Sequence, residues 1–220
     1  MRTIAIFDLD QTLVPFDCNR AWGQHLLEQG LDTGDFLVRQ QAFMDQYNAG
    51  TLDIRSYLRF SMEATVRAGS TLAHQALADF VERFVKPRIS PSVLELIDSH
   101  RQLGHHLLVI TATNAFVSRA VVDVLGIDDL VANELATDEQ GWFTGEMVGV
   151  PSFQGGKVTR FQSWLKTKAW ERSAVEVYFY SDSINDLPLL ARANHPIATN
   201  PSAALRAHAN HHGWPVLSLF

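Results

Sequence analysis

Short apolar runs alternate with amphipathic stretches along most of this chain. Residues 4–7, 106–110 and 175–180 are apolar and rich in β-branched or aromatic side chains, which is typical of strands buried on both faces of a sheet. Stretches with helical periodicity lie before and after the second run and before the third. This alternation predicts an α/β fold, a Rossmann-like parallel sheet with helices on both faces.

Turn-forming residues mark where several of these elements are expected to begin or end. Pro91 opens a helix that ends near Gly104, and Gly126 closes the helix that follows the second strand. Lys157 opens a further helix, and residues 128–155 are expected to form short strands and turns. Weaker strand candidates lie at residues 197–199 and 216–217.

The segment between the first strand and this alternating region has helical periodicity only. Ile54, Leu58 and Met62 recur every four residues behind a candidate N-cap at Asp53, and Ser70 is a candidate cap for another helix. About 70 residues suffice for a small bundle. We therefore predict a helical bundle over 16–87, inserted into an α/β core formed by 1–15 and 88–220.

Polar side chains cluster where the predicted strands end or a helix begins. Asp8 and Asp10 follow the first strand, Thr111 follows the second, Lys157 opens a helix, and residues 182–186 bring two aspartates and an asparagine after the third. Because parallel strands end at one edge of a sheet, these groups are expected to share a site. Each has an ordinary alternative: Thr111 as a helix cap, Lys157 as a solvated side chain, and the acids as turn residues.

The residue types in this cluster indicate a particular chemistry. Several carboxylates at one place repel one another and require a cation, and an all-oxygen ligand set suits Mg²⁺. A lysine and a threonine hydroxyl suit the oxygens of a phosphoryl group. The combination predicts phosphoryl transfer.

Composition narrows the class of protein further. The 220 residues are 46% apolar and 19% charged, so a sizeable core is expected and long disordered segments are not. The formal net charge of −6 disfavours general binding to nucleic acid or anionic membranes. Cys18 is the only cysteine, which excludes an intrachain disulfide. No apolar run reaches the roughly 18 residues that span a bilayer, and the first strand follows Met1 with no leader, so a cytoplasmic protein is expected.

Four short motifs occur in a recognisable order: FDLDQTL, VITAT, GGK and YSDSINDLPLL. Together they resemble the haloacid dehalogenase superfamily of phosphohydrolases, over nearly the whole chain. The helical insertion after the first motif resembles the phosphoserine-phosphatase-like branch. The resemblance implies a Mg²⁺-dependent phosphomonoester hydrolase acting on a small phosphorylated metabolite, with residues 16–87 as a cap over the strand ends.

The resemblance also implies a role for each motif carboxylate. Asp8 would be the nucleophile that forms an aspartyl-phosphate, ionised at pH 7 because the usual pKa of a carboxyl group is near 4. Asp10 would protonate the leaving oxygen and then deprotonate the attacking water. Asp8, Asp10, Asp182 and Asp186 would hold or support the Mg²⁺.

Phosphate binding is assigned in the same way. Thr111, Ala112, Lys157 and Asn185 would contact the phosphoryl group, and Lys157 would also keep Asp8 ionised as part of the catalytic set.

An acidic residue and an arginine of the cap are candidates for binding the leaving group. Asp17 lies where phosphoserine phosphatases carry an acid that binds the amino group of the substrate, and an N-cap role for it is equally expected. The arginine that would bind the carboxylate has no secure match, although Arg55 and Arg59 lie in about the right helix. An amine-bearing ester such as phosphoserine or histidinol phosphate is therefore the expected substrate.

Three other functions remain open from the sequence. A phosphotransferase or mutase would use the same residues with an acceptor other than water. A non-catalytic phosphoryl-binding module is a second alternative, and a signalling receiver is a third, although receivers are shorter and lack the insertion. An apolar cap face suits internal packing or contact with a second copy, so the sequence favours neither oligomeric state.

Overall fold

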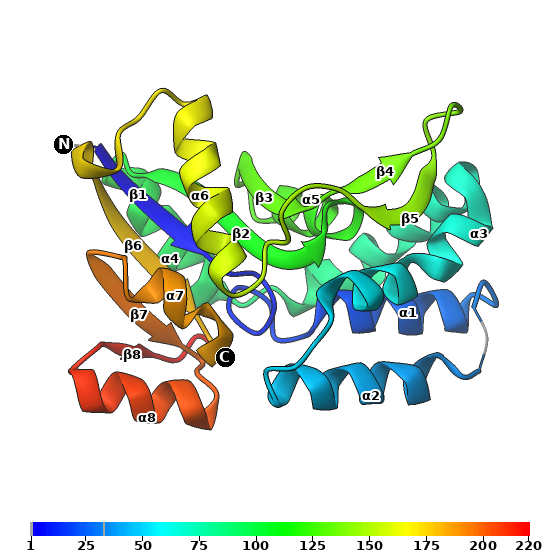
Figure 1. Cartoon of the computed structure of the whole chain (residues 1–220), viewed down its shortest axis with the longest axis horizontal. Coiled ribbons are helices and arrows are strands. Elements are labelled where there is room, and N and C mark those ends of the chain that lie inside the picture. Colours follow the sequence, from blue (N-terminus) through cyan, green and yellow to red (C-terminus); the bar gives the residue numbers. More distant parts are fainter. Residues whose placement is uncertain (1, 33) are drawn as a thin grey trace.

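The computed structural model describes residues 2–32 and 34–220, and its centre is a six-stranded sheet (Figure 1). All five strand pairings are parallel, in the order β3-β2-β1-β6-β7-β8. The predicted parallel sheet is confirmed. Its strands are β1 (Arg2–Phe7), β2 (His106–Asn114), β3 (Asp129–Asn133), β6 (Val175–Ser181), β7 (His195–Thr199) and β8 (Val216–Leu217).

Helices cover both faces of this sheet because successive side chains of each strand point to opposite sides. In β1, Ala5 and Phe7 pack in one core with α4 and α5, whereas Ile4 and Ile6 pack in a second core with α6, α7 and α8. The predicted Rossmann-like arrangement is therefore confirmed. These helices are α4 (Pro91–Gln102), α5 (Ala115–Val124), α6 (Gly155–Thr167), α7 (Leu187–Leu190) and α8 (Ala203–His212).

A helical insertion follows β1, as predicted. Asp17 and Asp53 cap its first and third helices by accepting hydrogen bonds from backbone N–H groups. The third helix is interrupted at Gly69, whose φ of 74° is accessible to glycine without strain, so a second helical stretch begins near Ser70, as expected. The helices are α1 (Cys18–Glu28), α2 (Phe36–Asn48) and α3 (Ile54–Phe80), followed by a π-helical turn, η1 (Val81–Val85), and a 3₁₀ turn, η2 (Lys86–Arg88).

A β-hairpin lies beside the insertion although it comes from the second half of the chain. Strands β4 (Leu135–Thr137) and β5 (Phe143–Met147) pair antiparallel, and the Trp142 indole donates to the Val66 carbonyl of α3 at 3.2 Å. The expected short strands are confirmed, and β3 among them belongs to the main sheet. The boundary of the cap at residues 16–87 stays a prediction.

The topology fixes where a site can form. From β1 the chain builds β2 and β3 on one side, then β6, β7 and β8 on the other, so the carboxyl ends of β1, β2 and β6 are neighbours. In open α/β sheets, ligands bind at such switch points. The 3₁₀ turn after β6 is η4 (Ile184–Asp186), and the one before β6 is η3 (Arg172–Ala174).

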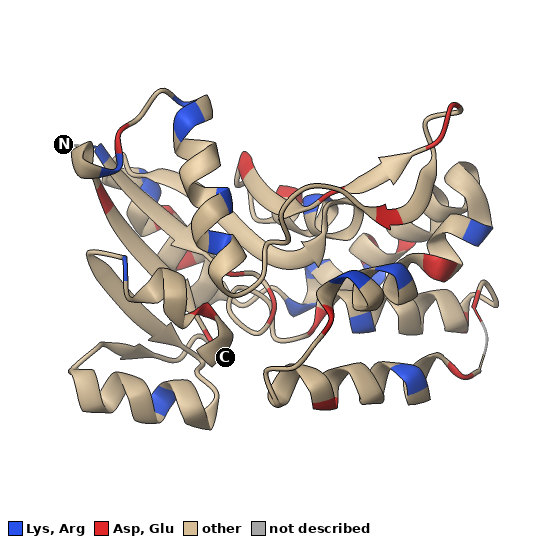
Figure 2. Ribbon diagram, in the orientation of Figure 1, with Lys and Arg blue, Asp and Glu red and all other residues tan. Residues whose placement is uncertain are grey.

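Among the described residues, the distribution of charge and the hydropathy of the helices do not indicate a further binding surface. In the view of Figure 2, Lys and Arg lie on several elements, and α3 and α6 each carry more than one. Within residues 2–32 and 34–220, no helix combines the length and apolar character needed to cross a membrane.

Candidate functional site

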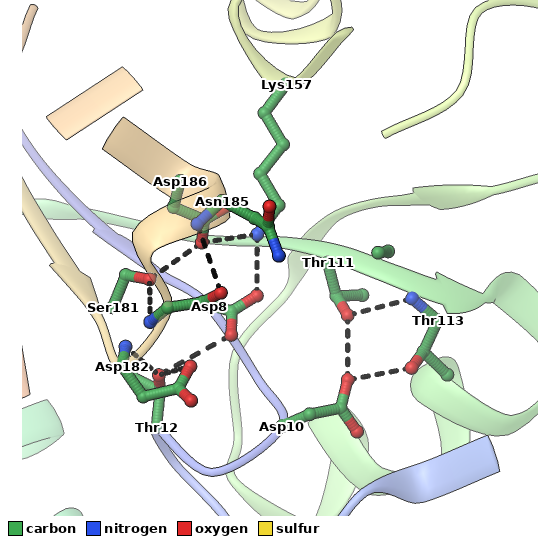
Figure 3. A network of polar contacts seen from close by, with 12 residues as sticks. Asp8, Asp10, Thr12, Thr111, Thr113, Lys157, Ser181, Asp182, Asn185 and Asp186 are labelled. Atoms are coloured by element: carbon green, nitrogen blue, oxygen red, sulfur yellow. Dashed lines mark hydrogen bonds and ion pairs between the residues drawn. The ribbon is translucent and has the colours of Figure 1, made fainter. Parts of the chain in front are cut away.

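Asp8 lies at the end of the central strand and at the centre of the polar cluster in Figure 3. Its backbone N–H donates to the Tyr180 carbonyl at 2.9 Å, which extends the pairing of β1 with β6 by one residue. Asp8 as a whole residue is only 7% exposed. Its Oδ1 accepts a hydrogen bond from Lys157 Nζ at 2.7 Å. The two residues are 149 positions apart in the sequence, and the site predicted from strand ends brings them together.

Lys157 holds two carboxylates at once. Its Nζ also donates to Asp186 Oδ2 at 2.7 Å, and the Ser181 hydroxyl donates to the same oxygen at 2.7 Å. Burial alone would lower the pKa of Lys157, but Asp186 and Asp8 raise it well above its usual value, so the ammonium stays charged. An ammonium has three donors, so one remains for a ligand beyond the two carboxylates.

The turn before Lys157 can only be made with glycine. A Cβ on Gly156 would lie 1.9 Å from the Pro151 carbonyl oxygen, a distance that no side chain tolerates. The close approach of these two backbone segments brings the start of α6 over the strand ends. The second glycine of the GGK motif thus has a structural reason that is independent of ligand binding.

Thr12 connects two of the predicted metal ligands. Its Oγ1 lies 3.5 Å from Asp8 Oδ2 and 3.4 Å from Asp182 Oδ1, and it accepts a hydrogen bond from the Asp182 N–H at 3.0 Å (Figure 3). A hydroxyl has one proton, so it cannot satisfy both carboxylates. One of the two carboxylates, Asp8 or Asp182, therefore lacks a hydrogen bond from Thr12.

Positive charge is scarce at this edge of the sheet. Burial raises the pKa of Asp8 to about 7 despite the opposing effect of Lys157. Burial, together with repulsion from Asp8 and Asp186, raises the pKa of Asp182 well above its usual value. Without a cation, Asp8 is therefore only partly ionised at neutral pH, and its ionised state in the working enzyme stays a prediction. A divalent cation would restore the ionised forms.

The donor set at this position fits Mg²⁺. Asp8 and Asp182 supply two carboxylates, whereas Asp186 is engaged through Oδ2 with Lys157 and Ser181. In the described part of the chain, no three His, Cys, Asp or Glu side chains form a ready-made metal cage. Mg²⁺ does not require one, because it commonly keeps several waters and binds through one or two carboxylates.

Asp10 is held in a separate hydrogen-bond network on the β2 side of the site (Figure 3). Its Oδ2 accepts from Thr113 Oγ1 at 2.7 Å and from Thr111 Oγ1 at 3.2 Å, and its Oδ1 accepts from the Cys18 N–H at 2.6 Å. Cys18 is the first residue of α1, so the carboxylate connects the sheet edge to the inserted helices. These contacts fix the orientation of the Asp10 carboxylate.

The strand that carries Thr111 is longer than predicted. β2 continues to Asn114, and the Asn114 side chain caps α5 by accepting from the Val117 N–H, so Thr111 is neither a helix cap nor near a helix start. Thr111 is fully buried behind the cavity, whereas Ala112 and Thr113 line it. The alternative role of Thr111 as a helix cap is therefore wrong.

Asn133 supports this strand end from the neighbouring edge strand. Its amide nitrogen donates to the Ala112 carbonyl at 2.6 Å, and its amide oxygen accepts from the Ser152 N–H at 2.7 Å. It therefore links the end of β2 to the loop that leads to Lys157. Its place at the end of β3 is not visible in the sequence, because a five-residue strand flanked by polar residues resembles a loop.

Asn185 contacts loops rather than the cavity. Its Oδ1 accepts from Gln154 Nε2 at 3.2 Å, and its Nδ2 donates to the Tyr47 carbonyl at 3.4 Å. The Tyr47 hydroxyl in turn shares a hydrogen bond of 2.7 Å with Ser183 Oγ. The C-terminal end of α2 is therefore attached directly to the loop after β6.

A cavity of about 420 Å³ lies between the strand ends and the inserted helices. Asp8, Asp10, Lys157, Asp182 and Asp186 line one part of it. The part formed by the insertion and the adjoining loops is largely apolar, with Phe16, Phe43, Met44, Tyr47, Leu52, Ile54, Tyr57, Phe84 and Phe153 among its lining residues. The acidic floor suits a charged reacting group, and the apolar walls suit an organic one.

Asp17 caps α1, as predicted, and it also lines this cavity, so its binding of a substrate amino group stays a prediction. Its Oδ1 accepts from the Arg20 N–H at 2.8 Å. Burial, and repulsion from Asp10, raise the pKa of Asp17 to about 7. A cation placed beside Asp17 would favour its ionised form.

Arg59 does not line the cavity. It pairs with Glu146 of the hairpin at 2.7 Å, with more than half of its side chain exposed. Arg55, one turn earlier, donates to the carbonyls of Met147 and Gly149. Both arginines therefore hold the hairpin against α3, and neither is placed to contact a ligand in the cavity.

Sequence reasoning missed Thr12, Thr113, Ser181 and Tyr47, all of which hydrogen-bond within or beside the cluster. Thr12 and Ser181 lie inside quoted motifs, so position alone could have identified them. Tyr47 carries no such signal, because a tyrosine on an amphipathic helix is ordinarily a packing residue.

Comparison with known proteins gives a consistent assignment. Residues 5–191 match the sequence family described as haloacid dehalogenase-like hydrolase. The histidinol-phosphatase of Neisseria meningitidis serogroup C is 38% identical over 220 residues, which cover 99% of each chain.

Solved structures agree at the level of the fold. A protein of unknown function from Bordetella pertussis Tohama I superposes with a TM-score of 0.92 at 32% identity, over 100% of both chains. A substrate-bound phosphoserine phosphatase superposes with a TM-score of 0.66 at 16% identity, over 99% of this chain and 93% of that one. At that identity the likeness concerns the fold alone.

Proposed function

Because this chain belongs to the haloacid dehalogenase-like hydrolase family and is a phosphatase, we propose that it hydrolyses a small phosphomonoester through an aspartyl-phosphate on Asp8, with Mg²⁺ as cofactor. The observation that carries the proposal is the position of Asp8. It is buried at the end of the central strand, 2.7 Å from Lys157, and it lines a cavity of about 420 Å³.

The proposed reaction has two steps. A carboxylate oxygen of Asp8 forms a bond to phosphorus while the ester P–O bond breaks, and Asp10 gives its proton to the departing oxygen. Water then attacks the phosphorus and releases Asp8, while Asp10 takes the proton from that water. Asp8, Asp182 and the Asp10 carbonyl would hold Mg²⁺, which supplies positive charge against the repulsion between carboxylate and phosphate.

The residues that we propose to contact the phosphoryl group differ slightly from those that the family resemblance implies. Lys157 has one free donor for a phosphoryl oxygen, and Ala112 and Thr113 line the cavity. Thr111 and Asn185 would then position the strand end and the loop, as their contacts to Asp10 and to Gln154 suggest. Asp186 would hold Lys157 rather than the metal.

Within this class, we propose histidinol phosphate as the substrate ahead of phosphoserine. Asp17 offers a carboxylate to an ammonium group, whereas Arg55 and Arg59 are engaged with the hairpin and do not line the cavity. Histidinol phosphate carries an ammonium and an aromatic ring but no carboxylate. The aromatic cavity wall and the histidinol-phosphatase relative support the same choice.

The test compares phosphate release from histidinol phosphate, phosphoserine and sugar phosphates in the wild type and in Asp17→Asn. We expect the wild type to prefer histidinol phosphate, and Asp17→Asn to lower kcat/KM for amino esters by about 10- to 100-fold relative to sugar phosphates, as for a lost hydrogen bond to a charged group. Asp45→Asn, the same change on an exposed part of α2, is the control. An unchanged preference in Asp17→Asn would refute the assignment, and a phosphorylated acceptor among the products would indicate a transferase.

A further inference from the structure

Three buried polar side chains meet in the inserted helices. Asn19 of α1 and Tyr57 of α3 line the cavity and are 3% and 6% exposed, and Gln40 of α2 is 1% exposed. Burying a polar group is unfavourable unless it is hydrogen-bonded. A polar cluster contributed by all three helices therefore requires an explanation beyond packing.

The orientation of the Asn19 amide is set by its neighbour. Asn114 caps α5 through its Oδ1, which accepts from the Val117 N–H at 2.9 Å. Its Nδ2 therefore faces Asn19 and donates to Asn19 Oδ1 at 2.7 Å. The amide nitrogen of Asn19 therefore remains a donor, and Asn19 lowers the pKa of the nearby Tyr57 hydroxyl against the larger effect of burial.

The Tyr57 oxygen accepts a hydrogen bond from Gln40 Nε2 at 3.2 Å. The phenol still has its own proton to donate, and among the described residues no acceptor lies within hydrogen-bond distance of it. In the present orientation of the Gln40 amide, Oε1 has no hydrogen-bond partner. If the amide were rotated by 180°, Oε1 could accept the Tyr57 proton, but the N–H donors of the amide would then be buried without partners.

The charge around Tyr57 determines which acceptor suits it. Burial, followed by the negative charges of Asp17 and Asp10, raises the pKa of Tyr57 well above its usual value, so the hydroxyl remains a neutral donor. The same two carboxylates would repel a substrate carboxylate at this place. A neutral acceptor is not repelled, and the Phe43 ring, 5.5 Å from that of Tyr57, also lines the cavity and favours a flat group.

We propose that Tyr57, held by Asn19 and Gln40, donates a hydrogen bond to a ring nitrogen of the leaving group and so selects esters that carry a neutral imidazole-type ring. The inference rests on the proposed phosphatase function and assigns a specificity-determining residue to it. Asp17 would bind the ammonium of the same leaving group, and Tyr57 would hydrogen-bond to its ring.

The test is Tyr57→Phe, assayed on histidinol phosphate and on phosphoethanolamine, an amino ester without a ring. At pH 8 we expect a fivefold to tenfold loss of kcat/KM on histidinol phosphate, about the effect of one neutral hydrogen bond, and little change on phosphoethanolamine. The loss should shrink below about pH 6.5, where a free imidazole becomes protonated and no longer accepts. Tyr178→Phe, the same change outside the cavity, is the control.

Different results would contradict the role of Tyr57 and the proposed phosphatase function. Equal losses on both esters, or a loss on histidinol phosphate that does not depend on pH, would overturn the role of Tyr57 while the phosphatase assignment stands. Failure of the wild type to hydrolyse histidinol phosphate would overturn both the substrate and the ring-reading role. Inhibition by the product histidinol gives a second readout, which Tyr57→Phe should weaken by the same factor.

Discussion

Replacing Asp8 by asparagine is expected to stabilise the metal-free protein at alkaline pH while it abolishes activity. The folded Asp8 carboxyl has a pKa of about 7, whereas its usual value is 3.8. The folded state therefore binds this proton more tightly than the unfolded state does. As pH rises from about 4 to about 7, the unfolded state of the wild type loses this proton while the folded state keeps it, so the wild type loses stability and Asp8→Asn does not.

The size of the effect follows from the separation of the two pKa values. At about 1.4 kcal/mol per pH unit, a rise from 3.8 to about 7 corresponds to roughly 4 kcal/mol above pH 7. At pH 5 the same relation gives only about 2 kcal/mol. Asparagine retains an oxygen that can accept from Lys157, so most of the difference comes from the removed charge.

The assay is urea unfolding with a chelator present, at pH 5 and at pH 8. The free energy of unfolding of Asp8→Asn should exceed that of the wild type, and the gap should widen with pH. Asp128→Asn, a change at an exposed position, should differ from the wild type by about 0.5 kcal/mol or less at both pH values. The reasoning is refuted if Asp8→Asn is no more stable than the wild type at pH 8. Added Mg²⁺ should stabilise the wild type and narrow the gap.

Two further substitutions test contacts of the site. Lys157→Met should lower kcat/KM by about 10²–10³ and should also destabilise the fold, because it leaves Asp8 and Asp186 without their ammonium partner. Steady-state kinetics with unfolding curves would show both effects, and wild-type activity would contradict the role of Lys157. Tyr47→Phe should lower kcat/KM about threefold to tenfold by removing the hydrogen bond from α2 to Ser183. Amide hydrogen exchange should be faster in α2, and unchanged exchange would contradict a link between the insertion and the loop.

The sequence was informative about the site where a strand end and its motif coincide. Asp8, Lys157, Asp182 and Asp186 meet as expected, because parallel strands end at one edge whatever loops connect them. The order of apolar and polar residues is enough for that inference. It does not require knowledge of side-chain directions.

Features that depend on contacts between distant segments were not predictable. Asn133 joins the end of β2 to the loop before Lys157, and this role appears only when β3 takes its place at the sheet edge. Arg59 was expected in the cavity because it lies in a suitable helix, but the turn of α3 directs it to Glu146 on the hairpin. Periodicity defines the apolar face of a helix and leaves the partner of each polar side chain open.

The measurement that tests the central claim most directly is phosphate release from histidinol phosphate by the wild type and by Asp8→Asn, with Mg²⁺ and with chelator. The account predicts release by the wild type with Mg²⁺, loss of release with chelator, and no release by Asp8→Asn under either condition. Folded Asp8→Asn that still releases phosphate at the wild-type rate would contradict the assignment of Asp8 as the nucleophile.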